Sequence, residues 1–114
     1  MTIDEFRVEM NLYRASVDEE ARSLKEPYIG LERLLALYDS FDEPECAMAD
    51  LVIREWVLSE DESVRWDAIA LIEERKLQAA APQLRLLATR LGSSRTPGSP
   101  FERKKVIRLL ADLA

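Results

Sequence analysis

The chain has 114 residues, of which 47% are hydrophobic and 33% are charged, and its formal net charge is −6. This length and composition predict one globular domain that folds without disulfides or metals. The chain has no histidine and one cysteine, Cys46, which excludes an intrachain disulfide, a thiolate zinc site and catalysis that depends on imidazole. We therefore expect no metal, no cofactor and no enzymatic activity.

Apolar periodicity and helix-breaking residues predict six helices and no strand. The first helix is expected over 3–24, where apolar side chains recur at spacings of three and four, and the second over 28–41, after Pro27. The third begins near Pro44, a residue suited to the first turn of a helix, and ends at about Leu58.

The second half of the chain continues the helical pattern. The fourth helix follows Asp61, a residue type that is favoured as an N-cap, and the fifth runs from Pro82 to Gly92. The sixth extends from Pro100 to Leu113.

The stretch GSSRTPGSPFE, residues 92–102, has the glycine and serine content of a phosphate-binding loop. It lacks the GK[ST] ending of such a loop and no strand is expected before it. We interpret it as a long connection in which Ser99 caps the last helix and Glu102, three residues later, completes a capping box.

Sequence features also predict where the protein resides. The opening MTIDEFRVEM lacks the basic and apolar regions of a signal peptide. No apolar run approaches the roughly 20 residues of a membrane span. We expect a soluble, cytoplasmic protein that makes no contact with membranes.

Residues 38 positions apart are similar in type, which indicates an internal repeat. The matching pairs are Pro44 and Pro82, Asp61 and Ser99, Arg65 and Arg103, Ile69 and Ile107, and Leu71 and Leu109. A repeat of this length predicts three copies of one helical hairpin.

Two segments resemble a known repeat family. DESVRWDAIALI, residues 61–72, resembles the second helix of a HEAT repeat, and APQLRLLATRL, residues 81–91, resembles the first helix of the next one. The resemblance covers 44–113 and is weak over 1–43. It implies an all-α fold, an α-α superhelix (solenoid) of three HEAT-like helical hairpins that forms a single domain over residues 1–114.

Charge is distributed unevenly along the chain. Residues 1–63 carry 17 acidic and 6 basic side chains, a net charge of −11, whereas residues 64–114 carry 5 and 10, a net charge of +5. This asymmetry favours a charged partner, although two oppositely biased solvated faces would give the same pattern. The acidic clusters DSFDEPE and SEDE stand at expected turns, where a helix N-terminus also favours them, and SEDE lacks the spacing of a calcium loop.

The two tryptophans have different expected roles. Trp56 lies on the apolar stripe of the third helix and is expected in the core. Trp66 lies off the stripe of the fourth helix, on the face of Glu73, so it either anchors an interface or packs against a neighbouring helix. The 38-residue register aligns Tyr28, Trp66 and Lys104 on one surface.

Small size, acidic balance and the run LRLLATRLGSSRTPGSPFERKKVIRLL resemble bacterial immunity proteins that protect against secreted toxins. The resemblance implies a non-catalytic protein that binds and neutralises a basic toxin domain, which the acidic half attracts. The candidate partner-binding residues are Tyr28, Asp39, Asp42, Glu43, Glu60, Glu62, Trp66 and Glu73.

Two alternatives remain open. One is a nucleic-acid-binding HEAT-like protein that uses the basic last helix, through Arg103, Lys104, Lys105 and Arg108. Its negative net charge and the lack of aromatic residues near that helix, apart from Phe101, make nucleic acid the less favoured ligand. The other alternative is a scaffold or assembly subunit.

Overall fold

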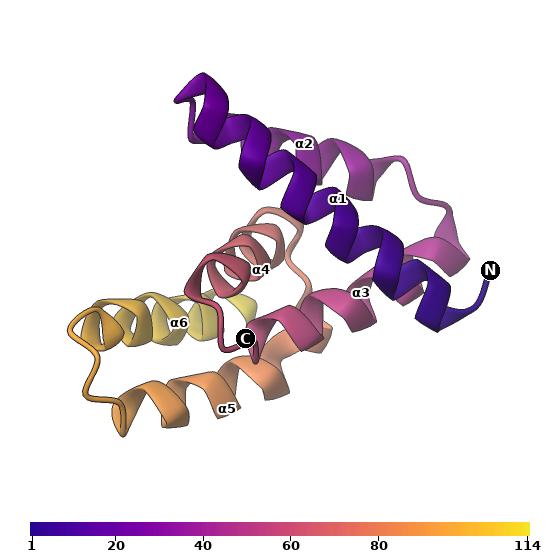
Figure 1. The fold of residues 1–114 in the computed structure, drawn as a ribbon. Helices are drawn as coiled ribbons and strands as arrows, with labels where there is room; N and C mark the ends of the chain where they lie inside the picture. Colours follow the sequence, from indigo (N-terminus) through magenta and orange to yellow (C-terminus); the bar gives the residue numbers. More distant parts are fainter. The chain divides into compact units, whose positions relative to one another are not determined.

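The computed structural model describes all residues, 1–114, and its regular elements are all helical (Figure 1). Six α-helices and one short 3-10 helix follow one another along the chain. They are α1 (Ile3–Leu24), α2 (Tyr28–Asp39), α3 (Glu43–Val57), α4 (Glu62–Arg75), η1 (Gln78–Ala80), α5 (Ala81–Gly92) and α6 (Ser99–Leu113). The prediction of an all-α fold with six helices is confirmed.

The expected bounds differ most at the end of α2, which stops two residues before Phe41. The Ser40 hydroxyl donates a hydrogen bond to the carbonyl of Leu37, at 2.6 Å, where the helix ends. Phe41 then leaves the helix, and its ring lies 5.1 Å from that of Phe6 and 6.5 Å from that of Tyr38. Aromatic packing therefore ends the helix earlier than its periodicity suggested.

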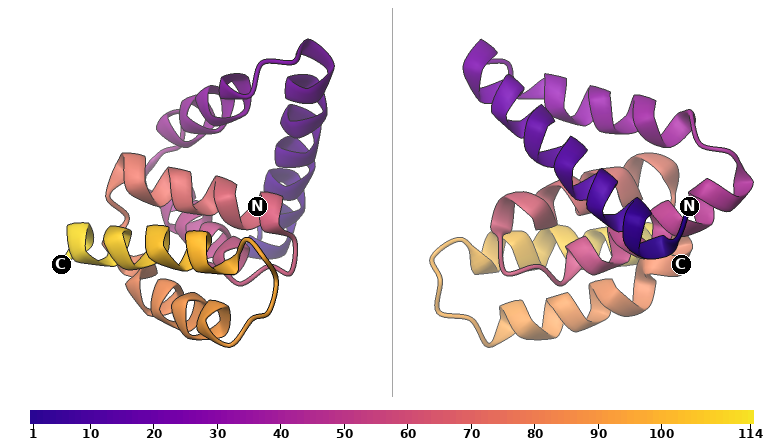
Figure 2. Two further views of the ribbon diagram at one scale, coloured as in Figure 1. Left: turned by 90° about the vertical axis from the view of Figure 1, so that its left-hand side faces the viewer. Right: turned by 45° about the vertical axis from the view of Figure 1, so that its right-hand side comes forward.

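The chain forms two compact units, residues 1–52 and residues 53–114, so the boundary lies inside α3. In the first unit, α1 and α2 form a helical hairpin whose two helices diverge from the connecting turn (Figure 2). Thr2 and Glu5 form a capping box at the start of α1, and hydrogen bonds from Thr2 lower the pKa of the Glu5 carboxyl. The buried apolar side chains of this unit are Phe6, Met10, Val17, Leu34, Ala49 and Val52.

The second unit contains the end of α3 and all later helices. α5 and α6 run antiparallel, joined by residues 93–98, and α4 lies beside α6 (Figures 1 and 2). The predicted N-cap of α4 is confirmed, because Asp61 Oδ1 accepts the backbone N–H of Ser63 at 2.8 Å. Trp56 is buried, as expected.

The predicted capping box at the start of α6 is wrong. Gly98 occupies the N-cap position, and Ser99 is already helical. The Ser99 hydroxyl pairs with that of Ser94 at 2.8 Å, and the Glu102 carboxylate binds Arg65 instead. A bidentate ion pair is stronger than one hydrogen bond to a backbone N–H. The Glu102 carboxylate therefore binds the guanidinium of Arg65 and does not cap the helix.

The 38-residue step relates positions of unequal environment. Ile69 on α4 is 1% exposed, whereas Ile107 on α6 is 45% exposed. The isoleucine at this repeat position is thus exposed on α6 but buried on α4. The superhelical arrangement of three hairpins, and the single repeat domain over 1–114, stay predictions.

Candidate functional site

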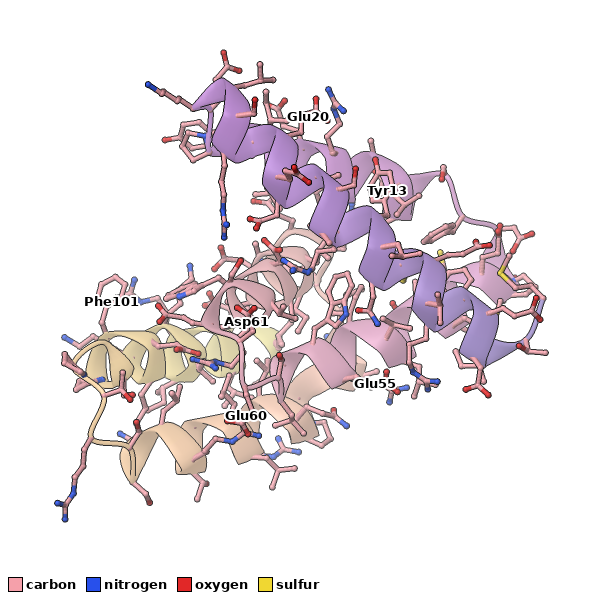
Figure 3. All side chains as sticks on the ribbon, viewed as in Figure 1. Tyr13, Glu20, Glu55, Glu60, Asp61 and Phe101 are labelled. Carbon is pink, nitrogen blue, oxygen red and sulfur yellow. The ribbon has the colours of Figure 1, made fainter.

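An aromatic pair joins α4 to α6 at the surface of the second unit. The ring centroids of Trp66 and Phe101 lie 6.2 Å apart, with the ring planes tilted by 44°. Phe101 is 73% exposed and projects from the first turn of α6 (Figure 3). Trp66 is half-buried, and its indole N–H donates to Glu62 Oε1 at 3.1 Å. The pair therefore offers a large apolar area in which one ring is already held in place.

A polar contact continues this surface along both helices. Lys105 Nζ lies 2.8 Å from Glu73 Oε2. Glu73 follows Trp66 by about two turns, and Lys105 follows Phe101 by about one, so each charge shares a face with its aromatic neighbour. We call Glu62, Trp66, Glu73, Phe101 and Lys105 the α4–α6 face.

A largely buried ion pair joins the start of α4 to the start of α6. Arg65 Nε lies 2.8 Å from Glu102 Oε2, and a second guanidinium nitrogen, Nη2, lies 3.0 Å from Oε1. Arg65 also donates to the carbonyls of Ser59 and Glu60, both at 3.1 Å. The hydrogen bonds to Glu102 raise the pKa of the Arg65 guanidinium, so it stays charged.

The ion pair and the aromatic pair involve neighbouring residues of α4 and α6. Arg65 precedes Trp66 in the chain, and Glu102 follows Phe101. The ion pair and the aromatic pair are therefore two neighbouring contacts between the same two helices. The ion pair joins residues 37 positions apart and ties together the two helices that carry the α4–α6 face.

A polar cavity of about 250 Å³ lies beside the ion pair, under residues 94–99. Its guanidiniums, from Arg65 and Arg90, already have protein partners: Arg90 Nη2 donates to the carbonyl of Leu58 at 3.1 Å. Its hydroxyls include those of Ser94 and Ser99, which bond to each other. Both guanidiniums and these two serine hydroxyls therefore already have partners in the protein.

The structure brings together three of the residues singled out from the sequence. Glu62, Trp66 and Glu73 share one face of α4 and belong to the α4–α6 face. Glu60 is exposed in the preceding turn (Figure 3) and borders the polar cavity. Glu60 therefore lies near the α4–α6 face but forms no hydrogen bond with Trp66.

The other four predicted residues belong to the first unit. Asp39, Asp42 and Glu43 are exposed around the turn between α2 and α3. Tyr28 is 78% exposed at the opposite end of α2, about 16 Å away along the helix axis. The acidic cluster is thus gathered at one turn, and Tyr28 is not part of it.

Sequence reasoning missed the role of Phe101 and of Lys105. The 38-residue register aligned Trp66 with Lys104, whereas the structure places its ring beside Phe101, almost one turn earlier. Helical side chains lean toward the N-terminus of their own helix, and neighbouring helices shift along each other as they pack. The signal in the sequence was Phe101, a large aromatic residue within one turn of Lys104, the aligned position.

The basic residues of α6 differ in what they contact. Arg103 Nε donates to the carbonyl of Ala88 at 3.2 Å, and Lys105 pairs with Glu73. Lys104 and Arg108 are exposed. Two of the four side chains proposed for nucleic acid thus already make contacts inside the unit.

No protein-family model, no curated protein and no solved structure matches this chain. The structure contains no group of three or more cysteine, aspartate or glutamate side chains placed to hold a metal ion. None of its helices combines the length and the apolar character needed to cross a bilayer. The α4–α6 face is the feature on which a functional proposal can rest.

Proposed function

We propose that this chain is a non-catalytic protein-binding module that uses the α4–α6 face. The observation that carries the proposal is the aromatic pair at the surface, in which the exposed ring of Phe101 lies 6.2 Å from the half-buried ring of Trp66. Aromatic residues that lose their remaining exposure in a complex are frequent hot spots of protein interfaces. The adjacent Glu73–Lys105 contact and the Glu62 carboxylate supply the polar rim that such interfaces have.

The charge of the first unit favours a basic partner. Residues 1–52 carry 13 acidic and 5 basic side chains, a net charge of −8. The carboxylates of Asp39, Asp42 and Glu43 are exposed at one turn. Such a surface speeds the encounter with a positively charged protein, and added salt screens the effect.

A bacterial toxin domain is the partner class that the sequence resemblance implies, and occlusion of its active surface would neutralise it. In this proposal the chain is an immunity protein. A stable complex with a housekeeping protein would instead favour a scaffold or assembly subunit. Both partners would use the same face, so the identity of the captured protein separates them.

Affinity capture from a lysate of the native host, at low salt, tests the proposal. The tagged chain is incubated with and without nuclease, and the eluate is identified by mass spectrometry. One stoichiometric basic protein that survives nuclease supports a protein-binding module. Recovery that depends on nucleic acid would instead move the function to Lys104 and Arg108.

Point variants then locate the binding surface on the captured partner. Phe101→Ala removes a side chain that is 73% exposed and makes one ring contact, so the free energy of unfolding should fall by no more than about 1.5 kcal/mol. Affinity for the partner should fall by roughly 30-fold or more, the effect of losing a hot spot. Leu86→Ala is the matched control, because Leu86 is apolar, 60% exposed and on α5. Equal affinity of the two variants would refute binding through the α4–α6 face.

A further inference from the structure

An apolar pocket opens on the surface of the first unit. Its volume is about 160 Å³, and its lining includes Phe6, Met10, Leu37 and Phe41, with Glu9 and Glu45 beside them. An engineered apolar cavity of about 150 Å³ in another protein holds a benzene molecule. This pocket therefore has room for one aliphatic or aromatic side chain.

Packing keeps the pocket walls in place. The ring centroids of Phe6 and Phe41 lie 5.1 Å apart, and those of Tyr38 and Phe41 lie 6.5 Å apart. Phe6 and Met10 are each no more than 5% exposed. A preformed apolar pocket pays little ordering cost when a side chain enters it.

The charge around the pocket selects what can enter. Glu9 is exposed, and Glu45 is held by a reciprocal pair of hydrogen bonds with Asp42, at 2.9 and 3.0 Å. No basic side chain lines the pocket, and its unit carries a net charge of −8. An apolar group next to an anion would be repelled there, whereas one next to a cation would be attracted.

We infer that this pocket is a second binding site, which takes the apolar side chain of a lysine- or arginine-rich segment of a protein. The apolar side chain fills the space between Phe6, Leu37 and Phe41, and the flanking cations face Glu9 and Glu45. The site belongs to the first unit and shares no residue with the α4–α6 face. It therefore stands or falls independently of the function proposed above.

Methionine methyl groups provide a direct measurement of occupancy. The chain has three methionines, of which Met1 and Met10 line the pocket and Met48 does not. The full chain, labelled with ¹³C in its methionine methyl groups, is titrated with the capped peptide KKLKK. We expect saturable shifts of the Met1 and Met10 methyl resonances and no shift of Met48.

Two control peptides separate the apolar and the charge contributions. EELEE keeps the leucine and reverses the charge, and KKSKK keeps the charge and removes the apolar side chain. Both should leave the Met10 resonance in place at concentrations where KKLKK shifts it. Equal shifts with EELEE, or an unchanged Met10 resonance with KKLKK, would overturn the proposal.

The double variant Glu9→Gln/Glu45→Gln tests the role of the rim. Glutamine at position 45 can preserve the hydrogen bonds of the α3 start, so the fold should be retained, which circular dichroism checks. Removing the two carboxylates should weaken KKLKK binding by about tenfold. An unchanged affinity of the double variant for KKLKK would show that charge does not select the segment. As a control, Phe101→Ala should bind KKLKK as the wild type does.

Discussion

The Arg65 guanidinium and the Glu102 carboxylate face each other in two parallel contacts of 2.8 and 3.0 Å, with both side chains largely removed from solvent. They join the first turns of α4 and α6. Their chain neighbours, Trp66 and Phe101, form the aromatic pair at the surface. One buried contact thereby connects the stability of the second unit to the geometry of its candidate binding face.

Removing one partner of this ion pair should destabilise the protein strongly. Arg65→Ala and Glu102→Ala should each lower the free energy of unfolding by about 3 kcal/mol or more, measured by urea denaturation. The arginine change should cost more. It leaves Glu102, whose side chain is 4% exposed, without its partner, whereas Arg65 without Glu102 keeps the carbonyls of Ser59 and Glu60.

A double replacement is the control for this prediction. Arg65→Met combined with Glu102→Leu removes both charges and keeps most of the side-chain volume. It should lie within about 1 kcal/mol of the wild type, because apolar substitutes for a buried ion pair are often neutral. Single variants that cost less than about 1 kcal/mol would show that the pair is solvated.

Replacing Lys76 with glycine should make the protein more stable. It ends α4 in the left-handed region, with φ at 53°, a conformation that disfavours a residue with a Cβ. Lys76→Gly should raise the free energy of unfolding by about 0.5–1 kcal/mol, visible as a higher melting temperature. The matched control is Lys104→Gly, at an exposed position inside α6, which should lower the free energy of unfolding by about 1 kcal/mol. Two changes of the same sign would contradict the prediction.

Cys46 should react slowly with alkylating reagents. Its thiol donates to the carbonyl of Phe41 at 3.8 Å, and burial, followed by the charge of Asp50, raises its pKa. Because only the thiolate reacts, the pH midpoint of iodoacetamide alkylation should lie above about 8.5, the value of a free thiol.

The sign of this effect can be checked in two ways. A raised pKa means that the native state favours the thiol, so the associated stability is present below the ordinary pKa and is lost as pH rises through the raised value. Unfolding in urea should return the alkylation midpoint to that of a free thiol, and Asp50→Asn should lower it partly. A native midpoint at or below the free value would contradict the burial of the sulfur.

Tyr38 should titrate at unusually high pH. Its hydroxyl donates to Asp50 Oδ1 at 2.8 Å, and burial, followed by this hydrogen bond, raises the pKa of the phenol. Its stabilising effect is thus complete below about pH 10, the ordinary value, and is lost as pH rises through the raised pKa. Near-ultraviolet absorbance should show a late titration step that Tyr38→Phe removes.

Tyr38→Phe should also lower the free energy of unfolding. A hydrogen bond to a charged group contributes about 1.5–3 kcal/mol, and the partial exposure of Tyr38 places the expected loss near the lower end. Tyr28→Phe is the control, since Tyr28 is 78% exposed and its change should fall within about 0.5 kcal/mol. Similar effects of the two variants would show that the Asp50 contact contributes nothing.

Part of the candidate site was visible in the sequence. Trp66 stood off the apolar stripe of its helix, and Glu62 and Glu73 shared its face by helical spacing. Phe101 was passed over, because its proximity to Trp66 depends on how far α6 is shifted along α4. The Arg65–Glu102 contact was likewise hidden, since Glu102 fitted a local capping motif equally well.

Local chemistry determined the helices themselves. Asp61 as an N-cap, Pro27 as a break, Pro82 at the start of a helix and the three-and-four spacing of apolar residues all act within a few positions, so the sequence alone predicted them. Tertiary packing decided the contacts between residues more than 30 positions apart, such as Glu73 with Lys105. Those contacts depend on the angles and offsets between helices, which arise only when many side chains pack at once.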